Sequence, residues 1–343
     1  MAEFANLSSS FPEQTNGQCR GLVAQNVFLG VVCFLGITTN SVLLAFIWKY
    51  RHGTLTPDKM LLMNYASVDL IACLVSLPLH ITALNGSLDL ADNDVCLARF
   101  FTMFTCFAVN IMTLATIAVD RYDAICLAPN RKITCKKTAY YLVFIWLFSC
   151  CTVVPGGTGH ILTAFERGYV CNRPGREIHT QALTGKTAML AVVTLWIVPS
   201  LCIIFYRFHG IVKYVREYSS HLRSVLGTSR VQKEVKLTKI CIAMVVTYLG
   251  SWLLFAIMVG LRNSYSSLAV HCTYLWAYSL AYSSFTVVPV EYMILDRRFR
   301  SSIWRKRRRR SRKVSPKHGG GSIHFQVSSE GLALRQHSDH SSL

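Results

Sequence analysis

Residues 21–48 read GLVAQNVFLGVVCFLGITTNSVLLAFIW, a run of 28 residues without one Asp, Glu, Lys or Arg. A helix needs roughly 20 mostly apolar residues to cross the hydrocarbon core of a bilayer. Six further runs follow, interrupted only by Asp69, and they cover residues 60–88, 100–119, 138–165, 187–206, 240–261 and 263–290. These runs are too long and too continuously apolar for barrel strands, so the sequence predicts seven transmembrane helices.

The composition agrees with a membrane protein, because 52% of the residues are hydrophobic and only 15% are charged, against about 25% charged in soluble domains. An extracellular N-terminus leaves 29 of the 36 basic residues on the cytoplasmic side, as the positive-inside rule requires. The densest basic run, 305–310, follows the last span and suits an anionic inner leaflet. The net charge of +19 is therefore a topology signal and does not indicate nucleic-acid binding. We expect a multi-pass plasma-membrane protein.

The chain divides into four predicted segments. Residues 1–21 form an extracellular segment, and residues 22–295 form the seven-helix domain. Residues 296–305 mix basic and apolar side chains, which predicts a short amphipathic eighth helix on the membrane surface. Residues 306–343 form a basic, Ser-rich cytoplasmic tail. The predicted fold class is an all-α seven-transmembrane bundle, and the sequons at Asn6 and Asn85 are candidate glycosylation sites on its outer side.

A polar, aromatic or proline landmark falls in each predicted helix. In chain order the landmarks are Asn40, Asp69, Asp120-Arg121-Tyr122, Trp146, Pro199 with Tyr206, Trp252, and Pro289 with Tyr292. As a set, they resemble the rhodopsin-like (class A) G-protein-coupled receptors over about residues 20–305. The resemblance implies a receptor and not an enzyme. Such a receptor binds an extracellular ligand and activates a heterotrimeric G protein when the cytoplasmic side of the bundle opens.

The resemblance assigns the switch to residues at the inner ends of the helices. Glu234 lies 18 residues before Trp252, where the family's pairing acid for Arg121 falls. The alternative is a solvated Glu234 among its basic neighbours. The residues implied for the switch and for G-protein coupling are Asp120, Arg121, Tyr122, Glu234, Tyr206, Pro289 and Tyr292.

Four of the thirteen cysteines lie in predicted outer segments, where disulfides persist, and four cysteines allow three pairings. The resemblance implies a bridge between Cys96 and Cys171. Cys19 and Cys272 are then a second bridge, as in purinergic-type receptors, or else two free thiols.

Asp69 is an ionisable residue inside a predicted span, which marks it as a functional candidate. The resemblance implies a sodium-and-water cluster formed by Asn40, Asp69, Asn110 and Ser284, with a sodium ion near Asp69. The alternative is a protonated, structural Asp69 that is hydrogen-bonded to Asn40.

The ligand is expected between the outer halves of the helices, although aromatic residues at helical spacing also fit plain core packing. The candidates are Met103, Phe104, Phe107, Trp252, Phe255, Tyr278 and Tyr282. Met103 replaces the acid of amine receptors and Tyr282 replaces the lysine of retinal opsins, so neither class is expected. The stretch Ser76–Leu79 favours the purinergic-like branch, although that branch's His and Arg in the sixth helix are missing.

Three departures from the family pattern bear on function. Val288 replaces the Asn or Asp before Pro289, Leu254 replaces the proline after Trp252, and Tyr206 follows Pro199 by seven residues instead of eight. They keep open a receptor with high basal activity or a non-signalling partner. A transporter is less favoured because no internal repeat is visible, and a metal enzyme because the histidines are scattered. The tail serines and the terminal Ser341-Ser342-Leu343 fit arrestin and PDZ partners.

Overall fold

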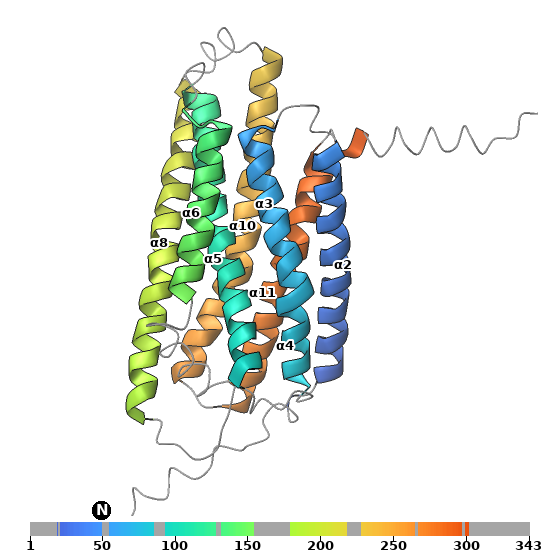
Figure 1. The fold of residues 1–343 in the computed structure, drawn as a ribbon, viewed down its shortest axis with the longest axis vertical. Helices are drawn as coiled ribbons and strands as arrows, with labels where there is room; N and C mark the ends of the chain where they lie inside the picture. Colours follow the sequence, from blue (N-terminus) through green and yellow to red (C-terminus); the bar gives the residue numbers. More distant parts are fainter. Residues whose placement is uncertain are drawn as a thin grey trace, which may run out of the picture. The chain divides into compact units, whose positions relative to one another are not determined.

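The computed structural model describes residues 19, 21–49, 55–85, 93–127, 132–153, 179–217, 228–264, 267–296 and 299–301. Within these ranges the regular structure is helical and contains no strand, which confirms the all-α prediction. The elements are α2 (Leu22–Lys49), α3 (Pro57–Ile71), η2 (Ala72–Ser76), α4 (Leu77–Leu84), α5 (Asn93–Cys126), α6 (Cys135–Val153), α8 (His179–Glu217), α10 (Thr228–Ser264) and α11 (Leu268–Leu295). Because α3, η2 and α4 are continuous, the described residues form seven rods (Figure 1).

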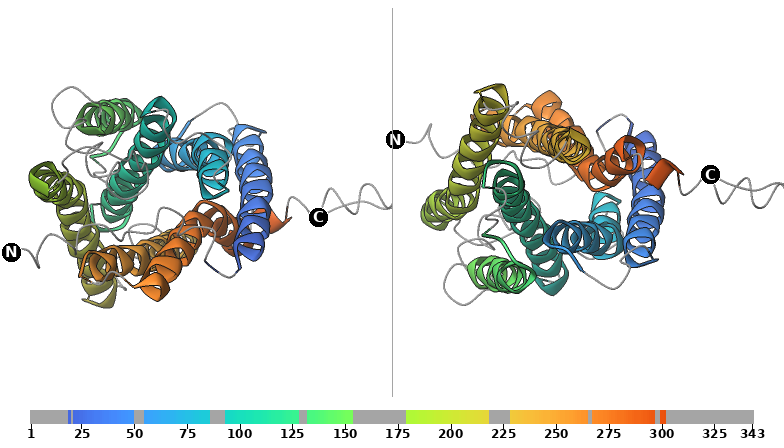
Figure 2. Two further views of the ribbon diagram at one scale, coloured as in Figure 1. Left: turned by 90° about the horizontal axis from the view of Figure 1, so that it is seen from below. Right: turned by 90° about the horizontal axis from the view of Figure 1, so that it is seen from above.

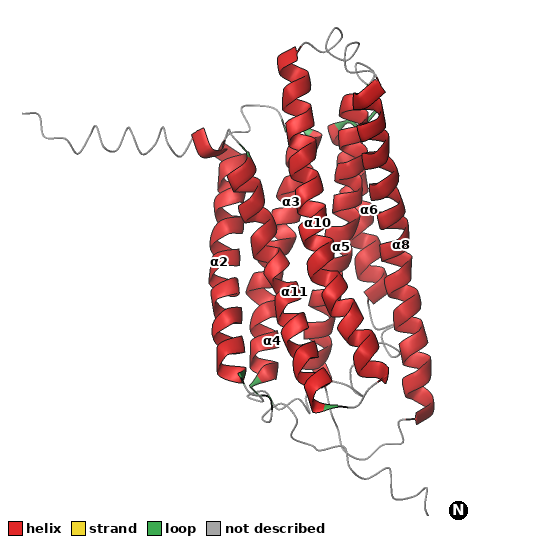
Figure 3. Ribbon diagram, turned by 180° about the vertical axis from the view of Figure 1, so that it is seen from behind, coloured by secondary structure: helices red, strands yellow, loops and turns green. Residues whose placement is uncertain are grey.

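The rods run side by side in one bundle (Figure 3). Contacts link α2 to α3, α3 to α5, α5 to α10, α10 to α11 and α11 back to α2. This ring is visible from both ends in Figure 2, and α6 and α8 pack on the outside of α5. We call the end that carries the Cys19–Cys272 disulfide the disulfide end, and the opposite end, where Arg121 lies, the Arg121 end.

The bundle has an apolar exterior and a polar interior. Val23 and Phe34 on α2 and Phe205 on α8 are more than two-thirds exposed, whereas Asp69 and Asn110 are fully buried. A soluble protein has the reverse distribution, because water replaces lipid as its solvent. This arrangement agrees with a protein that crosses a bilayer.

Five of the described helical stretches are long and apolar enough to cross a membrane, namely Leu22–Lys49, Pro57–Leu84, Phe101–Cys126, Trp196–Glu217 and Gln232–Leu261. The two remaining rods are α6 and α11. The apolar run of α6 continues to residue 165 in the sequence, beyond the described residues. The hydropathy of α11 is lowered by four tyrosines and three serines.

A π-helical segment, η2, interrupts the second rod just before Pro78. Proline lacks a backbone N–H and its ring clashes with the carbonyl four residues earlier, so a local change of helix type is expected there. Gly36 of α2 lies against this segment. A Cβ at Gly36 would collide with Cys73 Sγ and would lie 2.8 Å from Thr286 Oγ1. Glycine therefore permits the close approach of α2 to the second and seventh rods.

Residues Met1–Arg300 form one compact unit, and Ser301–Leu343 form a second one. Of the predicted eighth helix, 296–305, Asp296 is described as the extended residue that caps α11, and residues 299–301 are helical. Phe299 is 5% exposed, and its ring meets that of Phe46 edge-on with the centroids 4.7 Å apart. The tail residues predicted to bind arrestin or a PDZ domain lie outside the described residues.

Candidate functional site

The Arg121 end contains a buried ion-pair cluster that joins two helices. Arg121 of α5 bonds Asp120 Oδ2 through Nε, at 3.1 Å, and through Nη2. Its Nη1 donates to Glu234 Oε2 of α10 at 3.0 Å. The Arg121 side chain is only 3% exposed, and that of Glu234 is 18% exposed. The structure thus brings together the three charged residues expected at the switch, and their role as a switch stays a prediction.

Tyr122 packs tightly against α8. A Cβ at Gly210 would lie 2.8 Å from Tyr122 Cε2, so only glycine lets the ring approach this closely. The guanidinium carbon of Arg207 lies 4.8 Å from the centroid of the same ring, within cation–π range. The sequence analysis missed both Arg207 and Gly210.

Tyr206 does not join the switch residues in this structure. Its side chain is 69% exposed and lies outside the bundle core. The physical reason is its separation of seven residues from Pro199. Successive helical residues point about 100° apart, so Tyr206 and its neighbour Arg207 face different directions. Arg207, eight positions after Pro199, is the residue that contacts Tyr122.

The half of α11 nearer the Arg121 end is tied to α10 by another carboxylate, that of Glu291. Thr247 Oγ1 of α10 donates to Glu291 Oε1 at 2.6 Å. Glu291 Oε2 is buried and has no hydrogen-bond partner among the described residues. Nearby, Val288 is fully buried and Tyr292 is partly buried. The charge at Glu291 was visible in the sequence, but its partner Thr247 was not predicted.

Asp69 and Asn110 form the centre of the polar interior. Asn110 Nδ2 donates to Asp69 Oδ1 at 2.7 Å. Within the described part of the chain, Asp69 Oδ2 and Asn110 Oδ1 are buried without hydrogen-bond partners. Asn40 does not bond Asp69, because its Nδ2 donates to the carbonyls of Gly36 and Phe285. The alternative of an Asp69–Asn40 hydrogen bond is therefore wrong for this structure.

Ser284, the fourth residue of the predicted cluster, donates its hydroxyl to the Ala281 carbonyl of its own helix at 2.7 Å. It is fully buried and its oxygen keeps its acceptor capacity. No group of three or more His, Cys, Asp and Glu residues that could hold a metal ion occurs among the described residues.

The predicted ligand residues line one aromatic cluster in the disulfide-end half of the bundle. Phe107 and Trp252 have ring centroids 4.6 Å apart, and Phe255 stacks on Tyr278 at 4.8 Å. The Tyr278 hydroxyl contacts the sulfur of Met103. All the predicted ligand residues except Phe255 are at least 90% buried, namely Met103, Phe104, Phe107, Trp252, Tyr278 and Tyr282. The geometry brings them together, and their contact with a ligand stays a prediction.

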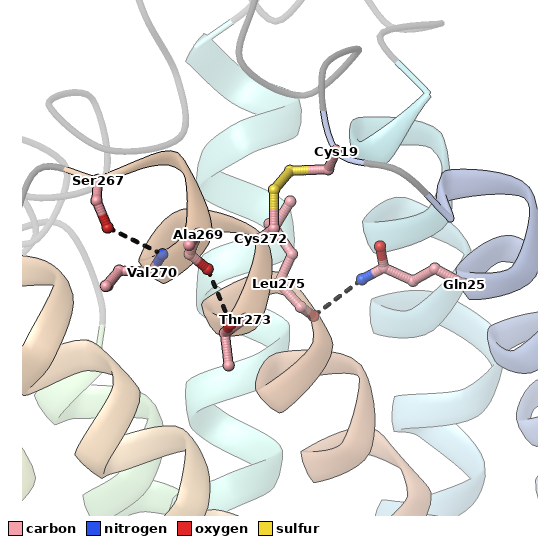
Figure 4. The surroundings of a disulfide bond; sticks show 8 residues. All are labelled: Cys19, Gln25, Ser267, Ala269, Val270, Cys272, Thr273 and Leu275. Carbon is pink, nitrogen blue, oxygen red and sulfur yellow. Dashed lines mark hydrogen bonds between the residues drawn. A yellow bond between two sulfur atoms is a disulfide. The ribbon is translucent and has the colours of Figure 1, made fainter.

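The disulfide between Cys19 and Cys272 is present, with 5.6 Å between the Cα atoms (Figure 4). It ties the segment before α2 to the first turns of α11. Gln25 of α2 adds hydrogen bonds to the Leu275 carbonyl at 2.9 Å and to Ser279 Oγ at 2.7 Å. This predicted pairing is confirmed.

Three other predicted outer sites are only partly described. Cys171 and the side chain of Cys96 lie outside the described residues, so their bridge stays a prediction. Asn6 also lies outside them. Asn85 is exposed, and its Nδ2, the atom that would carry a glycan, donates to the Ile81 carbonyl at 3.0 Å.

A bundle of seven rods with an apolar exterior, a polar interior and an Arg121–Glu234 contact defines a multi-pass membrane protein by class. A model of the family "7 transmembrane receptor (rhodopsin family)" matches residues 39–292, and the chain belongs to this family. Members of the family are receptors, so the prediction that the chain is not an enzyme is confirmed. The lean to a purinergic-like branch stays a prediction.

The chain is similar to the rhodopsin of Sepia officinalis, with 24% identity over 250 residues covering 69% of this chain and 53% of that protein. It is 22% identical to neuropeptide Y receptor type 6 of Oryctolagus cuniculus over 80% of this chain and 77% of that protein. The crystal structure of squid rhodopsin matches with a TM-score of 0.66 at 20% identity, over 84% of this chain and 80% of the other. The chain spans about half the length of the Sepia protein, and the structural match supports the fold.

Proposed function

We propose that the protein is a plasma-membrane receptor that transmits an extracellular signal to a heterotrimeric G protein. The disulfide end lies outside the cell, together with the N-terminus, and the Arg121 end faces the cytoplasm. The single observation that carries the proposal is the partly buried pairing of Arg121 on α5 with Glu234 on α10. Family membership supports the coupling to a G protein.

The geometry explains how such a pair works as a switch. A buried guanidinium requires its carboxylates, so α5 and α10 stay together as long as the Arg121–Glu234 contact persists. Separation of the helices hydrates the three charges and opens a cleft between α5 and α10. A ligand or a G protein that prefers the open form shifts this two-state equilibrium by its difference in affinity. The Arg121–Glu234 contact in the structure supports a closed form of this kind.

The test is a panel of G-protein dissociation sensors in cells that express the receptor or its Arg121→Ala variant at matched surface levels. We expect a signal above empty vector in at least one G-protein class, and Arg121→Ala abolishes it. Epitope tags at the two ends check the topology, because only the N-terminal tag is expected to label in intact cells. A signal that persists in Arg121→Ala, or two tags on the same face, contradicts the proposal.

A receptor-shaped partner that does not signal is the second candidate. The observation that favours it is Val288, a fully buried apolar residue at the position where the family carries an amide or a carboxylate before the proline. Val288 has no polar atom in its side chain, so it cannot form a hydrogen bond that connects α11 to Asp69. A silent sensor panel, combined with normal surface expression, favours this candidate.

We also propose a sodium ion beside Asp69. Hard cations take oxygen ligands. Asp69 Oδ2 and Asn110 Oδ1, which are buried and have no hydrogen-bond partners among the described residues, fit such an ion. These two residues would hold the ion. It would supply the positive charge that a buried carboxylate otherwise lacks.

A further inference from the structure

A buried carboxylate lies two residues after Arg121, and the proposed switch does not use it. Asp123 belongs to α5 and is 4% exposed. Successive residues of a helix point about 100° apart, so the side chain of Asp123 is turned about 200° away from that of Arg121. A buried carboxylate is stable only where donors or cations satisfy its charge. The donors that bond Asp123 therefore show what this side chain does.

Two backbone N–H groups of the segment before α6 donate to Asp123. The amide of Lys132 donates to Oδ2 at 3.2 Å, and the amide of Ile133 donates to the same oxygen at 3.0 Å. Hydrogen bonds to a charged acceptor are stronger than those between neutral groups. Asp123 therefore fastens the chain that precedes α6 to the end of α5.

The same part of the chain is also held by a contact with the residues before α3. Cys135 Sγ donates to the Leu55 carbonyl at 2.8 Å. The side chain of Ile133 is buried, at 6% exposed. We call residues 132–135 the anchored segment. Its contacts give it a defined position at the Arg121 end, beside α3, α5 and α6.

The anchored segment and the first turn of α6 present basic side chains, because Lys132, Lys136 and Lys137 are exposed. A standard protein–protein interface buries roughly 800 Å² on each partner, and the axes of packed helices lie about 8–10 Å apart. A partner that enters between α5 and α10 therefore also covers neighbouring helix ends. The start of α6 is one of these ends, since α6 packs on α5.

We propose that Asp123 is a positioning residue for G-protein coupling, because it holds the anchored segment and its exposed lysines where a docked G protein contacts them. The basic side chains fit an acidic region of that protein. Without the acceptor oxygen, the segment samples other positions, and ordering it again on binding costs conformational entropy. The inference rests on the proposed receptor function, since it names a further part of the same docking surface.

The experiment uses the full chain, purified in phosphatidylcholine nanodiscs, and compares the wild type with Asp123→Ala and Asp123→Asn. Asp123→Ala removes the acceptor of both amides. Asp123→Asn removes the charge but keeps one oxygen, which is enough because both amides donate to the same atom. Glu217→Ala is the control, because it removes an exposed carboxylate at the end of α8.

Hydrogen–deuterium exchange, resolved to single residues by fragmentation in the mass spectrometer, tests the anchoring. We expect the amides of Lys132 and Ile133 to exchange about tenfold faster in Asp123→Ala, the effect of losing a hydrogen bond to a charged group. Asp123→Asn lies between this variant and the wild type, and Glu217→Ala exchanges as the wild type. Unchanged exchange at both amides in Asp123→Ala overturns the anchoring. Equally faster exchange throughout α10 shows a general loss of stability and also overturns it.

Sensor recordings in cells, normalised to surface expression, test the effect on coupling. We expect Asp123→Ala to lose most of the G-protein signal, Asp123→Asn to restore much of it, and Glu217→Ala to signal as the wild type. An Arg121-dependent signal that is equal in the wild type and Asp123→Ala refutes this inference alone. A wild type without any signal refutes the proposed function and, with it, the coupling role, and the exchange rates then decide the anchoring on their own.

Discussion

Thr247 on α10 donates its hydroxyl hydrogen to Glu291 on α11 across 2.6 Å. Thr247 lies 13 residues after Glu234, which is about 20 Å along the helix. The sixth rod is therefore held at two levels, to α5 through the Arg121–Glu234 contact and to α11 through Thr247. If the Arg121 end of α10 moves away from the bundle, the Arg121–Glu234 bond must break. If the moving part of α10 includes Thr247, the Thr247–Glu291 bond must break as well.

Loss of the Thr247–Glu291 hydrogen bond is expected to raise basal activity. Thr247→Val keeps the shape of the side chain and removes the donor, and Glu291→Gln weakens the charge-assisted bond. A bond worth about 1 kcal/mol shifts the equilibrium between closed and open forms by about fivefold. Sensor signal without ligand, normalised to surface expression, measures the shift. Ser251→Ala is the control because, among the described residues, its hydroxyl bonds only the Thr247 carbonyl of its own helix. An equal rise in this control argues against a role for the Thr247–Glu291 bond.

The Arg121–Glu234 and Thr247–Glu291 bonds are expected to act independently. Glu234→Ala removes the first of them and should also raise basal activity. Because the two sites are more than 10 Å apart along α10, their free-energy effects should add to within about 0.5 kcal/mol in the double variant with Thr247→Val. The same sensors give the double-variant cycle. A double variant that is no more active than either single variant shows that the two bonds do not act independently on the position of α10.

Much of the fold follows from the sequence because bilayer thickness fixes the length of an apolar helix. The run 21–48 predicts α2 to within one residue at each end. The resemblance to the receptor family implied the pairing of Arg121 with Glu234, which lies 18 residues before Trp252, and the Cys19–Cys272 bridge. In each case the motif is recognised from chain position, which a single sequence contains.

The contacts that were missed depend on the rotation of one helix against another. The sequence contains a charge at Glu291, but the pattern of α11 does not reveal that Thr247 of α10 faces it. Tyr206 and Arg207 are neighbours in the sequence, but Tyr206 is exposed on the outside of the bundle and Arg207 contacts Tyr122. Arg99 comes just before the predicted span 100–119, and the sequence does not reveal that it is buried beside His80 of α4.

Gly36→Ala is expected to destabilise the receptor. The added methyl group would collide with Cys73 Sγ and approach Thr286 Oγ1 to 2.8 Å, and overpacking of this kind costs about 1–3 kcal/mol. Gly30→Ala on the same helix is a close control, because nothing lies within 4 Å of its added Cβ. Without a clash, Gly to Ala in a helix stabilises by about 0.5–1 kcal/mol. Melting curves of the purified protein should move in opposite directions, and a parallel shift contradicts the packing argument.

Removal of the disulfide is expected to lower thermal stability without changing the switch. Cys19→Ser and Cys272→Ser should cost the same amount, about 2–4 kcal/mol for a typical bridge, and the double variant should cost no more. Cys202→Ser, at a free and exposed cysteine, controls for the substitution itself. Additive losses in the double variant would show that the two thiols act separately. Basal signal per receptor at the surface should stay at the wild-type level.

Sodium is expected to stabilise the receptor through Asp69. In sodium chloride the melting temperature should exceed that in choline chloride at the same ionic strength, since a bound ion that favours the folded state stabilises it by mass action. Asp69→Asn removes the negative charge while keeping the shape of the side chain and its contact with Asn110, so the difference between the two salts should vanish. Asp58→Asn, which alters a carboxylate in the first turn of α3, should retain the difference. A sodium effect that survives Asp69→Asn places the ion elsewhere. An absent effect in the wild type leaves Asp69 Oδ2 to be satisfied by a proton or by water, because a buried carboxylate oxygen without any partner is too costly to persist.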